Sequence, residues 1–349
     1  MPRGRDDATR LLDVGGRTAP FSMHSSLTGD LARWHDALSA LAAQVDPDDL
    51  AATAAPELDA APLSKVLETL GLSVMARVVI GRDVRTEYML GPDEVSQLMA
   101  AWMTSLPRRS GDGFEGHRIV GGNDQLATGL ARELGDRVRL GTPVASVDPG
   151  RGEVTVRSGE RIAGEHVVAA VPLPVLARIW PDVPAPLAAA GYGIGGKLSI
   201  QYARRLWLDQ GSDGSVRTER AWGEVWETTD GQPGDAGVLT ALLSSHDGAA
   251  MAVMPETPDR IVDELDRIFP GSRGLAGERV HTDWTHDPYS LGAYVTFGPH
   301  QLLAALPYLQ CRYDRMLLAG EHTDAWAGYM EGALRSGARA ARAIIDGRP

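Results

Sequence analysis

Residues 317–344, LLAGEHTDAWAGYMEGALRSGARAARAI, carry the clearest chemical pattern in the chain. They predict a buried strand, a loop with Gly320 and Glu321, and a helix that begins near Tyr329. Small residues recur along this helix and would let another surface approach closely: Gly332, Ala333, Ser336, Gly337 and Ala340. A helix N-terminus exposes N–H groups and a partial positive charge, so it can bind an anion or an electron-rich carbonyl. A tightly packed helix without a ligand fits these features equally well.

Three further side chains could act on a bound small molecule. Judged by residue type alone, Tyr294 and Tyr329 would be core residues with satisfied hydroxyls. Lys197 lies in a stretch that alternates apolar and polar residues, as a half-buried strand does. A lysine there is either solvated or buried, and burial would lower its pKa.

Metal and disulfide chemistry is not expected. His286, His322 and Asp324 have no metal-ligand spacing among themselves. Cys311 is the only cysteine, so the chain cannot form an internal disulfide or a cysteine-based metal site. We therefore predict no metal, and a lone cysteine suits a reducing compartment.

The composition is that of an ordinary globular protein. At 349 residues the chain favours two domains over one. The formal charge of -12 argues against a nucleic-acid partner, because phosphate binding needs clustered Lys and Arg. No targeting segment and no run of 18 uncharged apolar residues is visible. We expect a cytoplasmic protein without a membrane span.

The pattern of elements predicts an α/β or α+β fold. The first hundred residues read as mostly helical, and Gly15-Gly16-Arg17 fits a hairpin. A Gly-rich loop is predicted at 108–116. The later helices are expected at 124–135, 258–268 and 329–345. The strands are expected at 138–140, 144–147, 154–156, 166–171 (buried on both faces), 197–202, 238–243 and near MLLAG.

The segment 317–344 resembles the C-terminal FAD-binding motif of the flavin-containing amine oxidases. That family includes monoamine oxidases, polyamine oxidases and many L-amino-acid oxidases. Gly320-Glu321 matches its pair near the ribityl and phosphate part of FAD, and residues 328–333 match its GYMEGA run, from Gly328 through Tyr329 to Ala333. The resemblance implies that the Met330 N–H meets the flavin C2 carbonyl, where negative charge collects on reduction.

Further segments resemble the same family in the same order. Residues 118–147 look like the stretch whose valine contacts the adenine, which is Val144 here, and residues 166–176 are similar to the strand and proline that follow. Residues 193–207 resemble the segment whose lysine sits near flavin N5 through a water, which gives that role to Lys197.

The active-site entrance is the last matching segment. Residues 284–294 resemble it and end in Tyr294. The resemblance implies that an amine, either a simple amine or an amino acid, binds between Tyr294 and Tyr329. It also implies hydride transfer to flavin N5, an imine product, and O2 reduction to hydrogen peroxide. Ala293 stands where monoamine oxidases carry the cysteine that binds FAD, so the FAD should be non-covalent.

One part of the family pattern is not found. No G-x-G-x-x-G follows a strand, so the opening Rossmann βαβ unit of a two-domain amine-oxidase fold is expected to be missing. The sequence would then be a fragment or mis-started, or a complementing chain would supply the unit. A homodimer is the other partner considered. We predict that the chain alone is largely flavin-free.

The domain boundaries follow from the order of the motifs. Residues 118–188 and 289–349 are predicted to form the FAD-binding domain, and residues 1–117 and 189–288 the substrate domain. Two alternatives remain. One is another FAD enzyme on this scaffold, similar to protoporphyrinogen oxidases or carotenoid desaturases. The other is a non-catalytic truncated product or a subunit completed by a partner. The choice among monoamine, polyamine and amino acid stays open.

Overall fold

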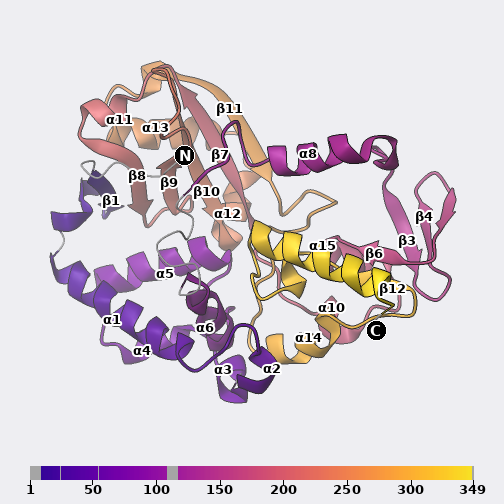
Figure 1. The fold of residues 1–349 in the computed structure, drawn as a ribbon. Coiled ribbons are helices and arrows are strands. Elements are labelled where there is room, and N and C mark those ends of the chain that lie inside the picture. Colours follow the sequence, from indigo (N-terminus) through magenta and orange to yellow (C-terminus); the bar gives the residue numbers. More distant parts are fainter. Residues whose placement is uncertain (1–8, 24, 54, 108–116, 348–349) are drawn as a thin grey trace.

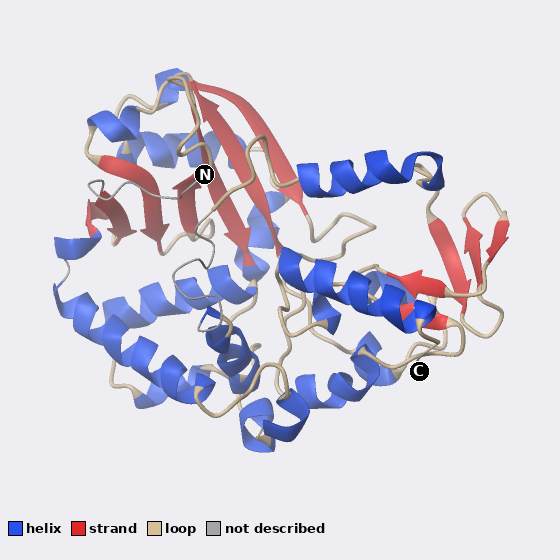
Figure 2. Ribbon diagram, viewed as in Figure 1, coloured by secondary structure: helices blue, strands red, loops and turns tan. Residues whose placement is uncertain are grey.

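A computed structural model describes residues 9–23, 25–53, 55–107 and 117–347 (Figure 1). Helices and strands are mixed throughout, as the sequence predicts. Figure 2 shows one large sheet on one side of the molecule, helices below it, and two small sheets at the opposite end. The Gly-rich loop predicted at 108–116 lies outside the described residues. None of the described helices is both long and apolar enough to cross a membrane.

The large sheet has seven strands in the order β11-β7-β10-β9-β8-β1-β2. Its strands are β1 (Thr9–Val14), β2 (Arg17–Pro20), β7 (Gly195–Tyr202), β8 (Ser212–Thr218), β9 (Glu224–Glu227), β10 (Gly237–Ser244) and β11 (Ala276–Asp283). The hairpin expected at the start forms between β1 and β2. Gly15 and Gly16 make its turn with φ of 62° and 74°, a region that glycine enters without steric cost.

The two faces of this sheet have different neighbours because side chains alternate along a strand. One face carries Leu198, Ile200 and Val225 into an apolar core that includes Ile261 and Leu265. The helices associated with this part of the chain are α11 (Leu206–Asp209), α12 (Ser245–Ala252) and α13 (Thr257–Ile268). The opposite face carries polar side chains and borders the cavities described below.

The first part of the chain is helical below the sheet (Figure 1). Its helices are α1 (Ser25–Ala42), α2 (Leu50–Thr53), α3 (Pro56–Ala60), α4 (Ser64–Thr69), α5 (Val74–Tyr88) and α6 (Gln97–Ser105). The sequence predicted this region as mostly helical but did not delimit α5, which is rich in β-branched residues, contains Gly81, and is capped by the Ser73 side chain. Trp34, Leu98 and Trp102 of this region share one core with Phe297 and Leu318 from the end of the chain.

Two small sheets lie at the far end. Strands β3 (Val144–Asp148), β4 (Glu153–Val156) and β5 (Arg161–Ala163) are antiparallel, and β6 (Val167–Ala169) pairs in parallel with β12 (Met316–Leu318). The prediction that 166–171 is buried on both faces is wrong at Val168, which is 41% exposed. In this two-stranded sheet, the described residues leave the side of β6 that carries Val168 partly open.

Residues 138–140 were predicted as a strand, and this prediction is wrong. They are not in a strand, and the nearby turns at Gly135 and Gly141 have φ of 56° and 64°. No described strand pairs with residues 138–140, so nothing satisfies an extended backbone there. The apolar residues Val138 and Leu140 alone suggested the strand.

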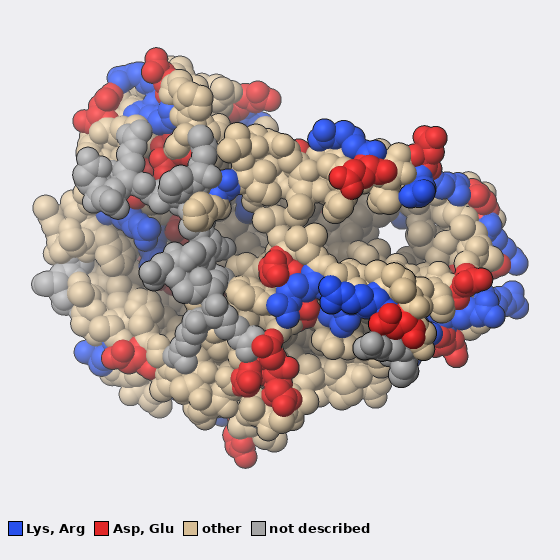
Figure 3. Space-filling view, viewed as in Figure 1, with Lys and Arg blue, Asp and Glu red and all other residues tan. Residues whose placement is uncertain are grey.

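The remaining helices are α8 (Gln125–Leu134), α9 (Leu173–Ile179), α10 (Ala185–Ala188), α14 (Leu302–Leu309) and α15 (Met330–Ile345). Helix α8 is amphipathic, yet none of its residues is buried, and Leu130 is 49% exposed. Figure 3 shows a hollow between α8 and α15 that opens through the molecule. The apolar side of α8 is therefore not covered by the described residues.

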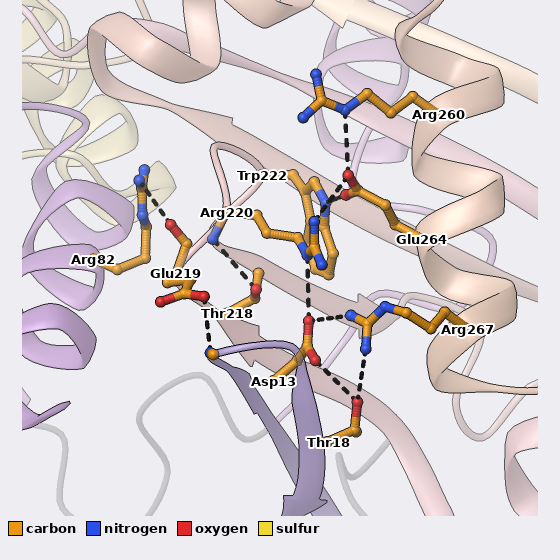
Figure 4. A network of polar contacts seen from close by, with 11 residues as sticks. Asp13, Thr18, Arg82, Thr218, Glu219, Arg220, Trp222, Arg260, Glu264 and Arg267 are labelled. Atoms are coloured by element: carbon orange, nitrogen blue, oxygen red, sulfur yellow. Dashed lines mark hydrogen bonds and ion pairs between the residues drawn. The ribbon is translucent and has the colours of Figure 1, made fainter.

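Asp13 anchors the hairpin to the large sheet and to α13 (Figure 4). Its side chain is buried and accepts hydrogen bonds from Thr18 (3.0 Å), Arg220 (3.3 Å) and Arg267 (2.5 Å). Arg220 also binds Glu264 of α13 at 3.1 Å. Burial alone would raise the pKa of Asp13, but the hydrogen bonds from Arg267, Thr18 and Arg220 outweigh it and lower the pKa.

We expect Asp13→Asn to lower the free energy of unfolding by about 2–3 kcal/mol. This is below the range for fully buried pairs because both arginines are partly solvated. The carboxylate stabilises the fold above its unfolded pKa of about 3.9, and this contribution is lost as the pH falls through the lower folded pKa. Urea unfolding of the wild type and Asp13→Asn at neutral and acidic pH measures both effects.

The control is Asp136→Asn, which removes the same charge from an exposed position. It should change the free energy of unfolding by less than about 0.5 kcal/mol. Equal effects of the two substitutions would contradict the anchoring role of Asp13.

Candidate active site

The Glu321 carboxylate joins three segments that are distant in sequence. Residue Glu321 opens the short 3-10 helix η5 (Glu321–Thr323) directly after β12. Its side chain accepts hydrogen bonds from the Tyr192 hydroxyl (3.0 Å), the Val295 N–H (3.0 Å) and the Gly328 N–H (2.6 Å). Burial raises the pKa of Glu321, although the Gly328 and Val295 N–H groups oppose this shift. The carboxylate therefore fixes the loop before α15 to residues 192 and 295.

Tyr294 and Tyr329 are brought together around this loop. The Tyr294 hydroxyl donates to the Glu87 carbonyl at 2.6 Å. Its ring lies against Gly328, where an added Cβ would be 3.7 Å from the ring. Gly328 has a φ of 78° and directly precedes Tyr329, so the two tyrosines flank one glycine. Burial raises the pKa of the Tyr294 hydroxyl well above its usual value, which keeps it protonated.

The strand that carries Lys197 is tied to the same place. The Gly193 N–H donates to the Tyr294 carbonyl at 2.8 Å, and the Ala293 N–H donates to the Gly193 carbonyl at 2.7 Å. Two segments singled out from the sequence, 193–207 and 284–294, are thus hydrogen-bonded neighbours. Gly193 also lets the chain pass close to α5, because a Cβ there would lie 2.6 Å from the Met89 side chain.

Helix α15 presents an open N-terminus beside the tyrosines. Tyr329 precedes it in an extended conformation, and no side chain caps the helix. Met330 is 51% exposed and Ala333 is also exposed, whereas Gly332 packs so closely that a Cβ would meet the Trp326 carbonyl at 2.2 Å. An uncapped, exposed N-terminus of a 16-residue helix suits an electron-rich carbonyl. The residues expected to meet a flavin therefore fit one.

The other predicted cofactor residues extend away from the tyrosines. Gly320 has a φ of 136°, and the His322 ring occupies the space of its missing Cβ. The Gly320 N–H donates a hydrogen bond to the Ser336 hydroxyl of α15 at 2.9 Å. Val144 opens β3 at the far end of the molecule, half-buried and paired with Val156 (Figure 1). The structure does not bring Val144 to the tyrosines, so the predicted sites at Val144 and Met330 would need an elongated ligand.

Lys197 lies in a neighbouring cavity. It projects from β7 into a cavity of about 580 Å³, with its ammonium 5.7 Å from the centre of the Trp226 ring. Water reaches the side chain, yet partial burial lowers the pKa of its amino group. Tyr329 lines an adjoining cavity of about 390 Å³. Thr86, Glu87 and Glu224 line both cavities, so the two adjoin.

Several residues at the site were not predicted to belong to it. Asp83 and Glu87 belong to α5, which the sequence did not delimit, and Tyr192 precedes β7 without a recognised motif. His322 is buried, which lowers its pKa to about 4 and keeps it neutral, and its Nε2 has no hydrogen-bond partner among the described residues. The described residues contain no cluster of His, Cys, Asp and Glu that could hold a metal.

We expect Glu321→Gln to lower the free energy of unfolding by about 1–3 kcal/mol. An amide offers one acceptor oxygen, so it leaves a buried N–H group without a partner. Thermal unfolding measures the loss, and Tyr192→Phe should cost less because it removes one of three donors. As a control, Glu133→Gln changes an exposed carboxylate of α8 and should have no measurable effect. If Glu321→Gln melts at the wild-type temperature, the Glu321 carboxylate does not hold the three segments together.

Comparison with known proteins places this geometry in a family. Residues 23–345 match the family described as flavin containing amine oxidoreductase. Human amine oxidase [flavin-containing] B is 28% identical over 251 residues, which is 67% of this chain and 48% of that protein. The L-amino acid dehydrogenase of Synechocystis sp. is 28% identical over 267 residues, 73% of this chain and 56% of that protein. The chain spans about half the length of these curated relatives.

Solved structures agree on the fold. Cyclohexylamine oxidase from Brevibacterium oxydans superposes with a TM-score of 0.87 at 24% identity, covering 99% of this chain and 82% of that one. Putrescine oxidase bound to putrescine gives a TM-score of 0.85 at 22% identity, covering 97% and 81%. The match over 23–345 exceeds half of the sequence. The chain therefore belongs to the flavin-containing amine oxidoreductase family, which implies a flavin cofactor.

Proposed function

We propose that this protein oxidises an amine with FAD, reducing O2 to hydrogen peroxide. The observation that carries the proposal is the pair Tyr294 and Tyr329, which flank Gly328 directly before the open N-terminus of α15. This arrangement would hold a small amine between two aromatic walls. The relatives include enzymes named oxidase and others named dehydrogenase, so O2 as the electron acceptor is part of the proposal.

The cofactor would be held by the residues that the sequence singled out. Met330 and Ala333 at the start of α15 would meet the flavin ring, Gly320 and Glu321 the middle of FAD, and Val144 the adenine. Bound FAD would supply the two-electron oxidation of the amine. Ala293 cannot form the thioether that a cysteine could, so the binding would be non-covalent. We also propose that 118–188 and 289–349 form the FAD-binding domain.

The side chains would set the protonation and orientation of the reacting amine. Both neighbours of the amine, Tyr294 and Tyr329, would supply aromatic walls, and the neutral Tyr294 hydroxyl would add no negative charge. Lys197 would hold a water molecule or proton near the reacting centre, and its lowered pKa would suit that role. No general base is needed if the amine arrives neutral.

The first experiment measures peroxide release from a panel of amines with FAD in excess. We expect Tyr329→Leu to lower kcat/KM roughly 10- to 100-fold, because one aromatic wall is lost and the amine is misplaced. Tyr308→Leu is the matched control, since Tyr308 is a partly exposed tyrosine of α14. Peroxide release that is absent for every amine, or unaffected by Tyr329→Leu, would refute the proposal.

The second experiment concerns how FAD is held. We expect most FAD to separate from the chain on gel filtration, because the described residues offer contacts to the flavin ring but no Gly-rich turn between a strand and a helix for the pyrophosphate. After denaturation, all flavin should remain in the supernatant. Stoichiometric FAD after gel filtration, or flavin that precipitates with the chain, would contradict these expectations.

A further inference from the structure

The cavity beside Tyr329 combines apolar walls with one acidic end. Trp34, Leu38 and Met103 supply apolar surface for an alkyl or aryl chain. Asp83, Glu87 and Glu224 supply three carboxylates, against one guanidinium, that of Arg217. Such a lining suits a ligand that is apolar in its middle and positively charged at its far end.

The single guanidinium is already occupied. Arg217 donates to Asp83 at 2.9 Å, and its guanidinium lies 5.8 Å from the centre of the Phe21 ring. The direct partner of Arg217 is therefore Asp83, and Arg217 acts on Glu224 only through space. Burial raises the pKa of Asp83 to about 6, and repulsion from Glu224 adds to the shift.

Glu224 occupies the point where the two cavities meet. It lines both, pairs across the sheet with Leu242, and Leu242 in turn pairs with Lys197. Residues paired in this way project from the same face, so Glu224 and Lys197 share the cavity face of the sheet. Among the described residues, no direct hydrogen bond or ion pair reaches the Glu224 carboxylate, although Arg217 and Arg10 attract it through space. Burial raises its pKa too, and the opposing effect of Arg217 and Arg10 is smaller.

We infer that Glu224 selects amines that carry a second positive charge, such as α,ω-diamines and polyamines, by binding the distal ammonium. This inference rests on the proposed function, because it takes the reacting amine to lie beside Tyr329. The alkyl chain would then run along the apolar wall, and the second ammonium would reach the carboxylate at its end.

An α-amino acid fits this cavity less well. Its carboxylate would need an unoccupied cation, and the cations of the adjoining cavity already have partners. Arg10 lies 3.9 Å from the Asp213 carboxylate. Arg118 donates to the Thr228 and Glu227 carbonyls, and the Lys197 ammonium lies over Trp226. A substrate carboxylate would instead meet Glu224 and Glu87, and like charges at short distance repel.

The test measures equilibrium binding by calorimetry, using the full chain with FAD in excess. The probes are α,ω-diaminobutane, butylamine and γ-aminobutyrate. On the unmodified protein we expect the diamine to bind roughly 10- to 100-fold more tightly than butylamine, the range of one charge-assisted hydrogen bond. Added salt should weaken this preference, because the second contact is electrostatic. Equal affinity for diamine and butylamine would overturn the inference without any substitution.

Two substitutions at Glu224 sharpen the result. Glu224→Gln should remove the preference for the diamine and leave butylamine binding within about threefold, because the apolar wall is intact. Glu224→Lys should reverse it, so that γ-aminobutyrate binds more tightly than the diamine. Glu165→Gln, which removes an exposed carboxylate elsewhere, should leave all three affinities unchanged. A diamine preference that survives Glu224→Gln would assign the selection to another group and contradict the inference.

Peroxide measured on the same samples separates this inference from the proposed function. Peroxide release from butylamine and diamine alike, with equal affinities, would overturn the inference and support amine oxidation. If the diamine is preferred through Glu224 but no amine yields peroxide, the inference is supported and the proposed oxidation is refuted.

Discussion

A buried carboxylate with three donors is the constraint on which the site depends. Glu321 receives the Tyr192 hydroxyl and two backbone N–H groups, those of Val295 and Gly328. Each donor comes from a different part of the chain, and each would be buried without a partner if the carboxylate were removed. Because Val295 and Gly328 are the sequence neighbours of Tyr294 and Tyr329, the same carboxylate also fixes the distance between the two tyrosines.

The large sheet separates an apolar core on one face from the polar cavities on the other face. One face buries leucine, isoleucine and valine side chains against α13, and its packing makes the strands rigid. The other face carries Lys197, Glu224 and Trp226 toward the cavities. Helix α5 closes the cavities from the opposite side with Asp83, Thr86 and Glu87. A rigid sheet and a fixed loop would hold the reacting groups in place in the amine oxidation that we propose.

The sequence predicted the elements with strong periodicity and the residues inside recognisable motifs. The helices 125–134, 257–268 and 330–345 and the hairpin at Gly15-Gly16 formed as expected, because their patterns or turn chemistry are local. The strand at 138–140 did not form, since strands need partners that a local pattern does not show. The bounds of α5 were not predicted within the region expected to be helical, because β-branched residues and Gly81 weaken its helical pattern. The exposure of Val168 depends on neighbours in space.

The site was predictable only in part for the same reason. Tyr294, Tyr329, Glu321 and Lys197 were named from motif order, but their partners Tyr192 and Glu87 are set by tertiary contacts. The predicted domain boundaries and residue roles remain predictions. The helices of residues 25–105 share one hydrophobic core with Phe297 and Leu318. The packing therefore does not mark a boundary between the two predicted domains at these positions.

The central claim is that the chain presents an amine to a bound flavin between Tyr294 and Tyr329. Its most direct test is anaerobic: oxidised FAD is supplied in excess, an amine is added without O2, and the visible absorbance of the oxidised flavin is followed. The account predicts that the amine bleaches this absorbance, that admitting O2 restores it, and that Tyr294→Leu slows the bleaching. Unchanged absorbance with every amine, or bleaching at the wild-type rate in Tyr294→Leu, would contradict it.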